Sequence, residues 1–248
     1  MSMAEATNEK ANLNWLLLLL KARTFVALVV VFAYFAYAAP NFLSAANALL
    51  ISKHVAINAF LAIGMTFVII TGGIDLSVGS VVGLTGMIAG WLVLYGIDPG
   101  LGWSIQFNTF EIIVIVCLVG IFVGWVNGIV ITKFNVAPFI ATLGMLYVAR
   151  GASLLLSGGR TFPNLNGNPD YGSDTFPLIG TGSFFGVPIM IWMLVAAACL
   201  AAYIAGRTPL GRQIYATGGN ERGAALSGVR VERVKLFVYM FSGLMAAL

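Results

Sequence analysis

The sequence contains few charged residues, one histidine and two cysteines. Charged residues make up 9% of the 248 residues, against about a quarter in soluble domains. With His54 as the only histidine, the sequence offers neither a metal cluster nor a Ser-His-Asp arrangement for catalysis. Cys117 and Cys199 lie in apolar segments without a CxxC partner, so we expect no disulfide and no metal site. These absences argue against a soluble enzyme and against a metalloprotein.

Two functional signals are also missing from the sequence. No GxxxxGKS or GxxxxGKT motif occurs, so we do not expect the chain to bind ATP through a P-loop, and we expect no cofactor. No small-residue cleavage site follows Leu16–Leu20, and the start of the chain carries Glu5, Glu9 and Lys10. Both features argue against a cleavable signal peptide. We therefore interpret residues 1–24 as a cytoplasmic N-terminal segment.

Apolar residues dominate the remainder, residues 25–248. Hydrophobic residues make up 60% of the chain, and its mean hydropathy is +0.96. The composition predicts an all-α, polytopic bundle of transmembrane helices, since a spanning helix needs about 20 apolar residues. The six expected spans are Phe25–Ala39, Val55–Ile70, Val81–Tyr95, Ile112–Thr132, Pro138–Leu156 and Val187–Ala205. The apolar run Leu236–Leu248 rises only about 20 Å, so we expect a truncated seventh span and a longer parent protein.

The basic residues predict the orientation. Six of the 13 lie between Arg207 and Lys235, a segment flanked by long apolar stretches. With the N-terminus inside and six crossings, the inner side holds Lys10, Lys21, Arg23, Lys133 and those six. The outer side then holds only Lys53 and Arg160. This bias is typical of cytoplasmic loops in membrane proteins, and it indicates orientation and lipid contact rather than nucleic-acid binding. The count requires both the second and the third span to cross fully.

The basic segment 207–235 contains signals for a short cytoplasmic helix. Pro209 and Gly211 are expected to end the preceding helix. Gly218-Gly219-Asn220 is expected to form a turn, after which Asn220 caps a helix from Glu221 to Ser227. Gly228 is a suitable residue to terminate that helix. The segment therefore predicts a capped helix between two spans.

The segment Thr71–Ser80 predicts a break between two apolar helices. Gly72-Gly73 and Gly79 bracket Asp75 and Ser77. Irregular backbone at membrane depth is tolerated only where protein or a water-filled cavity meets it, and an acidic residue there is a functional candidate. Two interpretations remain open. Asp75 either caps the following helix with the help of Ser77, or it lines or gates a polar path.

Other polar residues and a glycine series lie inside the expected spans. Arg150 costs at least about 2.5 kcal/mol at membrane depth unless it finds water or a partner. It could pair with Asp75, extend toward the outer face or bind backbone carbonyls. Asn127 is expected to form an interhelical hydrogen bond, with a place in a polar path as the alternative. It follows Gly120 and Gly124, which with Gly128 form the series GxxxGxxxG, and this series predicts close helix packing.

Three stretches in order resemble the ribose-type sugar ABC importer permeases of bacteria, in the branched-chain amino acid and ribose permease superfamily. They are AIGMTFVIITGGIDLSVGS (62–80), NGIVITKFNVAPFIATLGMLYVARG (127–151) and TPLGRQIYATGGNERGAALSGVRVERVK (208–235). The resemblance runs from about Pro40 to the end. It implies a subunit that dimerises and works with a cytoplasmic ABC ATPase and a periplasmic sugar-binding protein. It implies about ten membrane helices in a full-length chain.

The same resemblance implies that the segment around Gly219–Gly228 docks onto the ATPase as the coupling helix. The residues carried over to this contact are Gly218, Gly219, Asn220, Ala224, Ala225, Ser227 and Gly228. We therefore expect a permease for a pentose, hexose or polyol in the bacterial inner membrane, not catalytic itself. An ion-coupled secondary transporter is one alternative, because broken helices with Gly and Asp also fit that class. A non-transporting membrane fragment is another.

Overall fold

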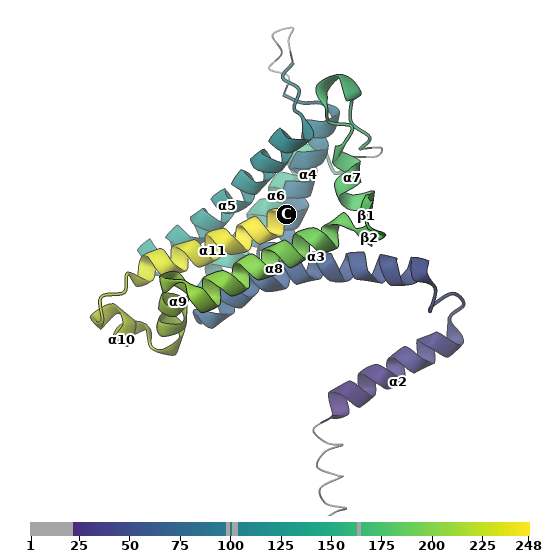
Figure 1. The fold of residues 1–248 in the computed structure, drawn as a ribbon. Coiled ribbons are helices and arrows are strands. Elements are labelled where there is room, and N and C mark those ends of the chain that lie inside the picture. The colour runs from purple at the N-terminus through teal and green to yellow at the C-terminus, as the bar shows by residue number, and fades with distance from the viewer. Residues whose placement is uncertain (1–21, 98–99, 101–103, 163–164) are drawn as a thin grey trace, which may run out of the picture. The chain divides into compact units, whose positions relative to one another are not determined.

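A computed structural model describes residues 22–97, 100, 104–162 and 165–248 (Figure 1). The helices are α2 (Arg23–Ala38), α3 (Ala45–Ile70), α4 (Val78–Leu94), α5 (Thr109–Lys133), α6 (Pro138–Ser157), α7 (Phe176–Thr181), α8 (Ile189–Arg207), α9 (Pro209–Gly219), α10 (Glu221–Leu226) and α11 (Val231–Ala247). A 3-10 turn, η1 (Pro169–Tyr171), and a two-stranded hairpin, β1 (Ser183–Phe184) with β2 (Val187–Pro188), complete the elements. The all-α membrane bundle expected from the sequence is confirmed.

The chain divides into two units, residues 1–51 and 52–248. In the first unit, α2 agrees with the expected span Phe25–Ala39, and none of its residues is buried. Phe42 follows the helix and packs on Phe32 and Phe35, with ring centroids 5.3 Å and 5.9 Å apart. Exposed apolar side chains all around a helix are typical of a segment surrounded by lipid. The expected N-terminal segment lies outside the described residues up to residue 21.

Helix α3 is longer than predicted. The expected span began at Val55, but the helix begins at Ala45 and includes Lys53, which had been placed in an outer loop. The Ser44 hydroxyl accepts a hydrogen bond from the Asn47 amide at 3.2 Å, which stabilises the first turn. No glycine or proline lies between residues 45 and 63, so nothing interrupts the helix despite its polar residues.

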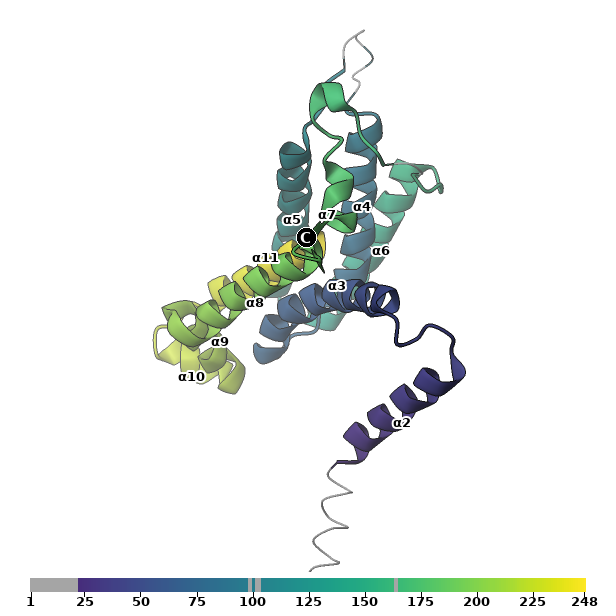
Figure 2. The same ribbon diagram turned by 45° about the vertical axis from the view of Figure 1, so that its right-hand side comes forward.

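Helices α4, α5 and α6 pack side by side (Figure 2). Their bounds agree with the expected spans to within three residues at each end. A capping box starts α5: the Asn108 side chain accepts from the Glu111 amide, and the Glu111 carboxylate accepts from the Asn108 amide. Among the described helices, α3, α5, α6 and α8 are long and apolar enough to span a membrane, while α2 and α4 are shorter apolar helices. The expected count of six crossings stays a prediction.

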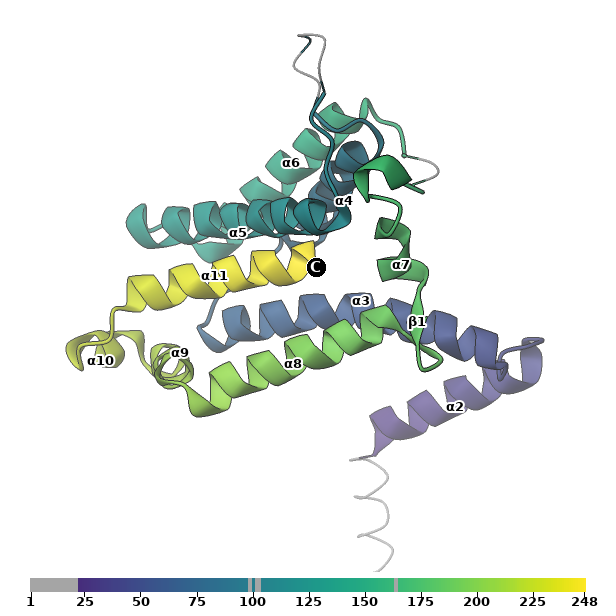
Figure 3. The same cartoon turned by 45° about the horizontal axis from the view of Figure 1, so that its top comes forward.

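Helix α11 runs between α5 and α3 (Figure 3). It was expected to begin at Leu236, but it begins at Val231 because no helix breaker follows Gly228. The series Gly120, Gly124 and Gly128 lies directly against its backbone, as the glycine spacing predicted. On the opposite side, Gly64 of α3 also approaches the α11 backbone. Glycines on two neighbouring helices therefore allow α11 to enter the centre of the bundle.

The loop expected over Ser157–Gly186 contains structure that the sequence pattern did not reveal. Besides η1, α7 and the β1–β2 hairpin, it contacts the start of α5. The Thr109 and Thr175 hydroxyls lie 2.7 Å apart, and the Thr109 hydroxyl donates to the Gly172 carbonyl at 3.1 Å. These contacts gather the loops at one end of the second unit, opposite α9 and α10 (Figure 1).

Candidate functional site

The helix break predicted near Thr71–Ser80 is present. Helix α3 ends at Ile70, α4 begins at Val78, and Gly72 has a positive φ of 77° that a side chain would strain. Asp75 is only 3% exposed. Its Oδ1 accepts hydrogen bonds from the Ser77 amide at 3.0 Å and from the Ser77 hydroxyl at 2.6 Å. Asp75 therefore stabilises the turn that leads into α4, and it does so from a buried position.

Four buried side chains form a continuous hydrogen-bonded network at the break. Asp75 Oδ2 accepts from the Ser242 hydroxyl of α11 at 2.9 Å, and Asn127 Nδ2 of α5 donates to Ser77 Oγ at 3.0 Å. The interhelical hydrogen bond expected for Asn127 is thus confirmed. Sequence reasoning missed Ser242, although it is the one serine of α11 and lies in the apolar part of that helix. The network joins the break to α5 and α11.

Helix α6 also contacts the break, but Arg150 does not. The Thr142 hydroxyl of α6 lies 3.2 Å from the Ile74 carbonyl. Arg150 is exposed, and within the described part of the chain its side chain makes no ion pair or hydrogen bond. Asp75 instead binds neutral hydroxyl and amide groups. The structure therefore does not bring about the pairing of Arg150 with Asp75 that was left open.

The basic segment contains a helix that was not predicted, α9. Helix α8 ends at Arg207, as expected from Pro209, and Pro209 itself occupies the first position of α9, where its missing N–H costs nothing. The Thr208 hydroxyl caps this helix by accepting from the Gly211 amide at 3.1 Å. Gly211 lies against the carbonyls of Ile204 and Ala205, a place that admits no side chain. Gly218 and Gly219, expected in a turn, are the last residues of α9.

The short helix predicted after Asn220 is confirmed as α10. Asn220 Oδ1 accepts from the Gly223 amide at 2.9 Å, which is the expected N-cap. Gly228 has a φ of 87° and donates to the Ala225 carbonyl, while the Val229 amide donates to the Ala224 carbonyl. This pair of bonds is a Schellman motif. The helix ends at Leu226, one residue before the predicted end at Ser227.

One contact connects the basic segment directly to the end of α3 at the break, and two further contacts link the segment and the break through α11. Gly218 of α9 lies directly against the Ile70 carbonyl at the end of α3. Lys235 Nζ of α11 forms an ion pair with Glu221 Oε1 of α10 at 2.7 Å. Tyr239, four residues after Lys235 and on the same helix face, places its hydroxyl against Gly73. Sequence reasoning treated the break and the basic segment as separate candidates, and the structure joins them.

A cavity of about 340 Å³ lies at this junction. The break, the end of α9, the start of α10 and one face of α11 line it. The Tyr239 hydroxyl is buried and has no hydrogen-bond partner among the described residues. A buried hydroxyl of this kind is usually satisfied by an ordered water or a ligand. The junction therefore offers a polar cavity between the basic segment and the buried Asp75 network.

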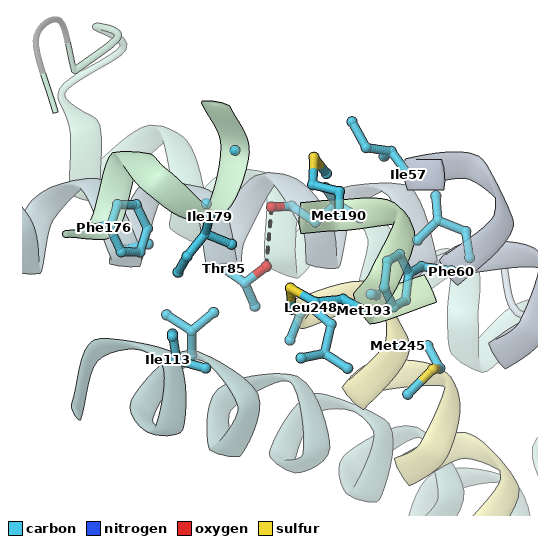
Figure 4. A pocket seen from close by; sticks show the side chains of 18 residues that line it. Ile57, Phe60, Thr85, Ile113, Phe176, Ile179, Met190, Met193, Met245 and Leu248 are labelled. Carbon is cyan, nitrogen blue, oxygen red and sulfur yellow. Dashed lines mark hydrogen bonds between the residues drawn. The ribbon is translucent and has the colours of Figure 1, made fainter. Parts of the chain in front are cut away.

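A second cavity of about 340 Å³ lies between helices α3, α4, α5, α7, α8 and α11 and is apolar (Figure 4). Met190, Met193 and Met245 contribute to its walls. Thr85 is the one hydroxyl residue among its described lining side chains, and this hydroxyl lies 2.8 Å and 3.1 Å from the carbonyls of Val81 and Val82 in its own helix. Among the described lining side chains, the cavity thus has no hydroxyl proton left to donate to a sugar.

Comparison with the sequences of known proteins places the chain in a family. The family described as branched-chain amino acid transport system / permease component matches residues 47–248. The chain is 40% identical over 241 residues to the ribose import permease protein of Haemophilus influenzae, covering 97% of this chain and 71% of that protein. It is 39% identical over 209 residues to the ribose import permease protein of Bacillus subtilis, covering 84% of this chain and 60% of that protein.

A relative with another named substrate is also similar. The chain is 34% identical over 223 residues to the autoinducer 2 import system permease protein of Yersinia pestis, covering 90% of this chain and 59% of that protein. The chain thus spans 59 to 71% of the length of these three relatives. No solved structure matches it significantly. The matched residues include the break, the Asp75 network and helices α9 to α11, and the chain therefore belongs to the branched-chain amino acid transport system permease family.

Proposed function

We propose that the chain is a transmembrane permease subunit of a bacterial ABC importer for a pentose, hexose or related polyol. The names of the ribose import relatives support a sugar as substrate. The observation that carries the proposal is the contact of α9, next to α10, with the end of α3 at the helix break, because an importer must pass movement from a cytoplasmic ATPase to its membrane path. ATP is hydrolysed on a separate ATPase subunit, and a periplasmic binding protein and a second permease copy complete the complex.

The geometry supports a mechanism in which α10 acts as the coupling helix. The ATPase contacts α10 from the cytoplasm, on the same side as the N-terminus in the inner membrane. Movement of α10 passes through the Glu221–Lys235 ion pair to α11, and movement of α9 passes through Gly218 to the end of α3. Helices α3 and α11 meet at the break that contains Asp75, and α11 contributes Ser242 to the network there. Rigid-body movement of packed helices then opens the path alternately to each side.

The residues proposed for the polar path or its gate are Asp75, Ser77, Asn127 and Arg150. A neutral sugar is bound by hydrogen bonds, which serine, asparagine and carboxylate groups supply. Asp75, Ser77 and Asn127 are buried and bonded to one another, so they act as a closed gate in the described conformation. Arg150 is exposed on α6, and its guanidinium has no partner among the residues that the structure describes, so it can donate to a sugar hydroxyl.

The expected coupling residues fall into three groups. Ala225 and Ser227 are exposed, and so is Leu226 between them, which was not among the expected residues and is 90% exposed at the end of α10. Gly218 contacts α3 and Ala224 is buried, so these two support α10 rather than meet a partner. Asn220 and Gly228 define the ends of the helix, and Gly219 closes α9. We infer that the ATPase binds the exposed group, with Leu226 as the apolar anchor.

The variant Leu226→Glu is expected to reduce co-purification of the ATPase at least tenfold, because a buried apolar anchor would become an unpaired charge. The measurement is the amount of ATPase retained on the purified permease in detergent. Phe185→Glu serves as the matched control, since Phe185 is equally exposed, at 85%, but lies in the hairpin at the other end of the unit. Equal retention of the ATPase by both variants would remove Leu226 from the contact.

The variant Asp75→Asn is expected to lower sugar uptake about tenfold, a change of about 1.4 kcal/mol in the barrier, while the complex still assembles. The amide keeps one acceptor oxygen but places an NH₂ group at one of the two positions now bonded to Ser77 and Ser242. The measurement is radiolabelled sugar uptake into liposomes. Asp174→Asn is the control, because Asp174 is exposed in the loop after η1. Normal uptake by Asp75→Asn would restrict Asp75 to its structural role.

The proposed function is tested by reconstitution with an ABC ATPase and a sugar-binding protein from the same organism. Uptake is expected to require ATP on the side of the liposome membrane that α10 faces. It is also expected to persist when ionophores collapse the ion gradients. Uptake driven by an ion gradient without ATP would establish the secondary transporter instead. Absence of uptake with every driving force, together with loss of ATPase binding, would leave a membrane fragment without transport.

A further inference from the structure

A third cavity, of about 760 Å³, lies beside α10 and adjoins the junction cavity, with which it shares Ile131 and the Glu221–Lys235 ion pair. One wall is the last turn of α5 with the residue Asn135, and the other is the segment from Glu221 to Lys235. Its apolar floor consists of Ile131, Val229 and Val231, all partly or fully buried. Its rim carries the charged residues Glu221, Arg222, Arg230, Glu232, Arg233 and Lys235. The cavity therefore combines an apolar floor with a basic rim.

The charges on the rim do not cancel. Lys235 and Glu221 neutralise each other at 2.7 Å. Three arginines then face a single carboxylate, that of Glu232. Within the described part of the chain, the side chains of Arg222, Arg230 and Arg233 make no ion pair or hydrogen bond. A planar guanidinium binds phosphate with two parallel hydrogen bonds, so this rim has the chemistry of a phosphate site.

The position of the cavity along α5 matches the depth of lipid headgroups. Helix α5 has 25 residues and is roughly 37 Å long. The hydrocarbon core of a bilayer is about 30 Å thick, so the ends of α5 extend beyond it. The cavity is lined by Ile131 and Thr132, two residues and one residue before the end of the helix at Lys133. Its arginines therefore lie at the level where phospholipid phosphates are found.

We propose that this cavity binds the phosphate of an anionic phospholipid headgroup from the leaflet on the side of α10. The arginines bind the phosphate, and the apolar floor covers the glycerol end of the acyl chains. Basic pockets between membrane helices bind anionic headgroups by the same combination of charge and burial. The bound lipid would hold the start of α11 beside α10, next to the ion pair that links these helices. This site is independent of the sugar that the protein transports.

The experiment measures lipid retention on the purified chain by native mass spectrometry in detergent. The probe is phosphatidylglycerol, with phosphatidylcholine, a zwitterion whose choline offsets its phosphate charge, as the reference of zero net charge. We expect the double variant Arg230→Gln, Arg233→Gln to retain at least tenfold less phosphatidylglycerol than the wild type. The matched control is Arg207→Gln, Arg212→Gln, which removes the same charge from exposed arginines of the same basic segment outside the cavity. This control is expected to retain the lipid normally.

Three results would overturn the proposal. Equal loss of lipid in both double variants would reduce the effect to general attraction by net charge. Displacement of the lipid by millimolar inorganic phosphate would identify a soluble anion as the ligand. Unchanged lipid retention combined with loss of ATPase binding in the cavity variant would assign the arginines to the ATPase contact. Because the lipid assay contains neither ATPase nor sugar, failure of the importer assignment would leave its result unaffected.

Discussion

Replacing Gly124 with leucine is expected to separate α11 from α5 and to destabilise the protein strongly. A side chain at Gly124 would meet the carbonyl of Tyr239 and the Cα of Met240, which are backbone atoms that no rotamer change can move. Overpacking in a dense interior costs about 3 kcal/mol at the upper end of the usual range. For a chain of this size, that corresponds to a fall in Tm of roughly 6–12 °C. Thermal unfolding in detergent measures the effect.

The matched control for this variant is Gly144→Leu. Gly144 lies within α6, is exposed and has no atom within 4 Å of the position of a Cβ. Leucine there also increases helix propensity. We therefore expect Gly144→Leu to keep the wild-type Tm to within a few degrees. If both variants unfold at the same reduced temperature, the glycine series on α5 does not define the packing of α11.

The second large effect is expected at Gly218, where α9 touches the end of α3. The variant Gly218→Ala places a methyl group on the Ile70 carbonyl, so α9 must move away from the helix break. If this contact transmits movement, sugar uptake should fall more than tenfold while the ATPase still binds and hydrolyses ATP. The paired measurements are uptake and ATP hydrolysis in the same liposomes. Loss of uptake without loss of ATP hydrolysis is the signature of uncoupling.

Gly219→Ala provides a control one residue away. A methyl group at Gly219 has no atom within 4 Å, and Gly219 is likewise in the last turn of α9. Both variants lose the same backbone freedom, so they differ only in the contact with α3. Uptake by Gly219→Ala is expected to stay within twofold of the wild type. Similar uptake in both variants would show that the contact between α9 and α3 carries no movement.

Much of the fold follows from hydropathy and from the placement of glycine and proline. The bounds of α5, α6 and α8 agree with the sequence prediction because long apolar runs leave little freedom in their placement. Helix α9 was missed because Pro209 was interpreted as a breaker, although proline also suits the first turn of a helix. The early start of α3 was missed because Lys53 and His54 interrupt the hydrophobic pattern without interrupting the backbone.

The site was predicted only in part, for a different reason. Asp75, Ser77 and Asn127 could be selected as polar residues in apolar surroundings, and the structure brings them together. Ser242 is separated from Asp75 by 167 residues, and no local pattern indicates which helix lies beside the break. The contact between Gly218 and Ile70 is likewise a property of tertiary packing. Local signals identify the polar residues, and the pairing of helices decides which of them meet.

The central place of α11 has a consequence for biogenesis. This helix is the last in the order of synthesis among the described elements, yet it fills the space between α5 and α3 and supplies the Ser242 hydroxyl to Asp75. Until α11 leaves the translocon, Asp75 lacks one of its donors and the glycine face of α5 has no neighbour. An incompletely hydrogen-bonded carboxylate is costly in lipid. The inserted helices therefore lack these contacts until α11 arrives, donates the Ser242 hydroxyl to Asp75 and covers the glycine face of α5.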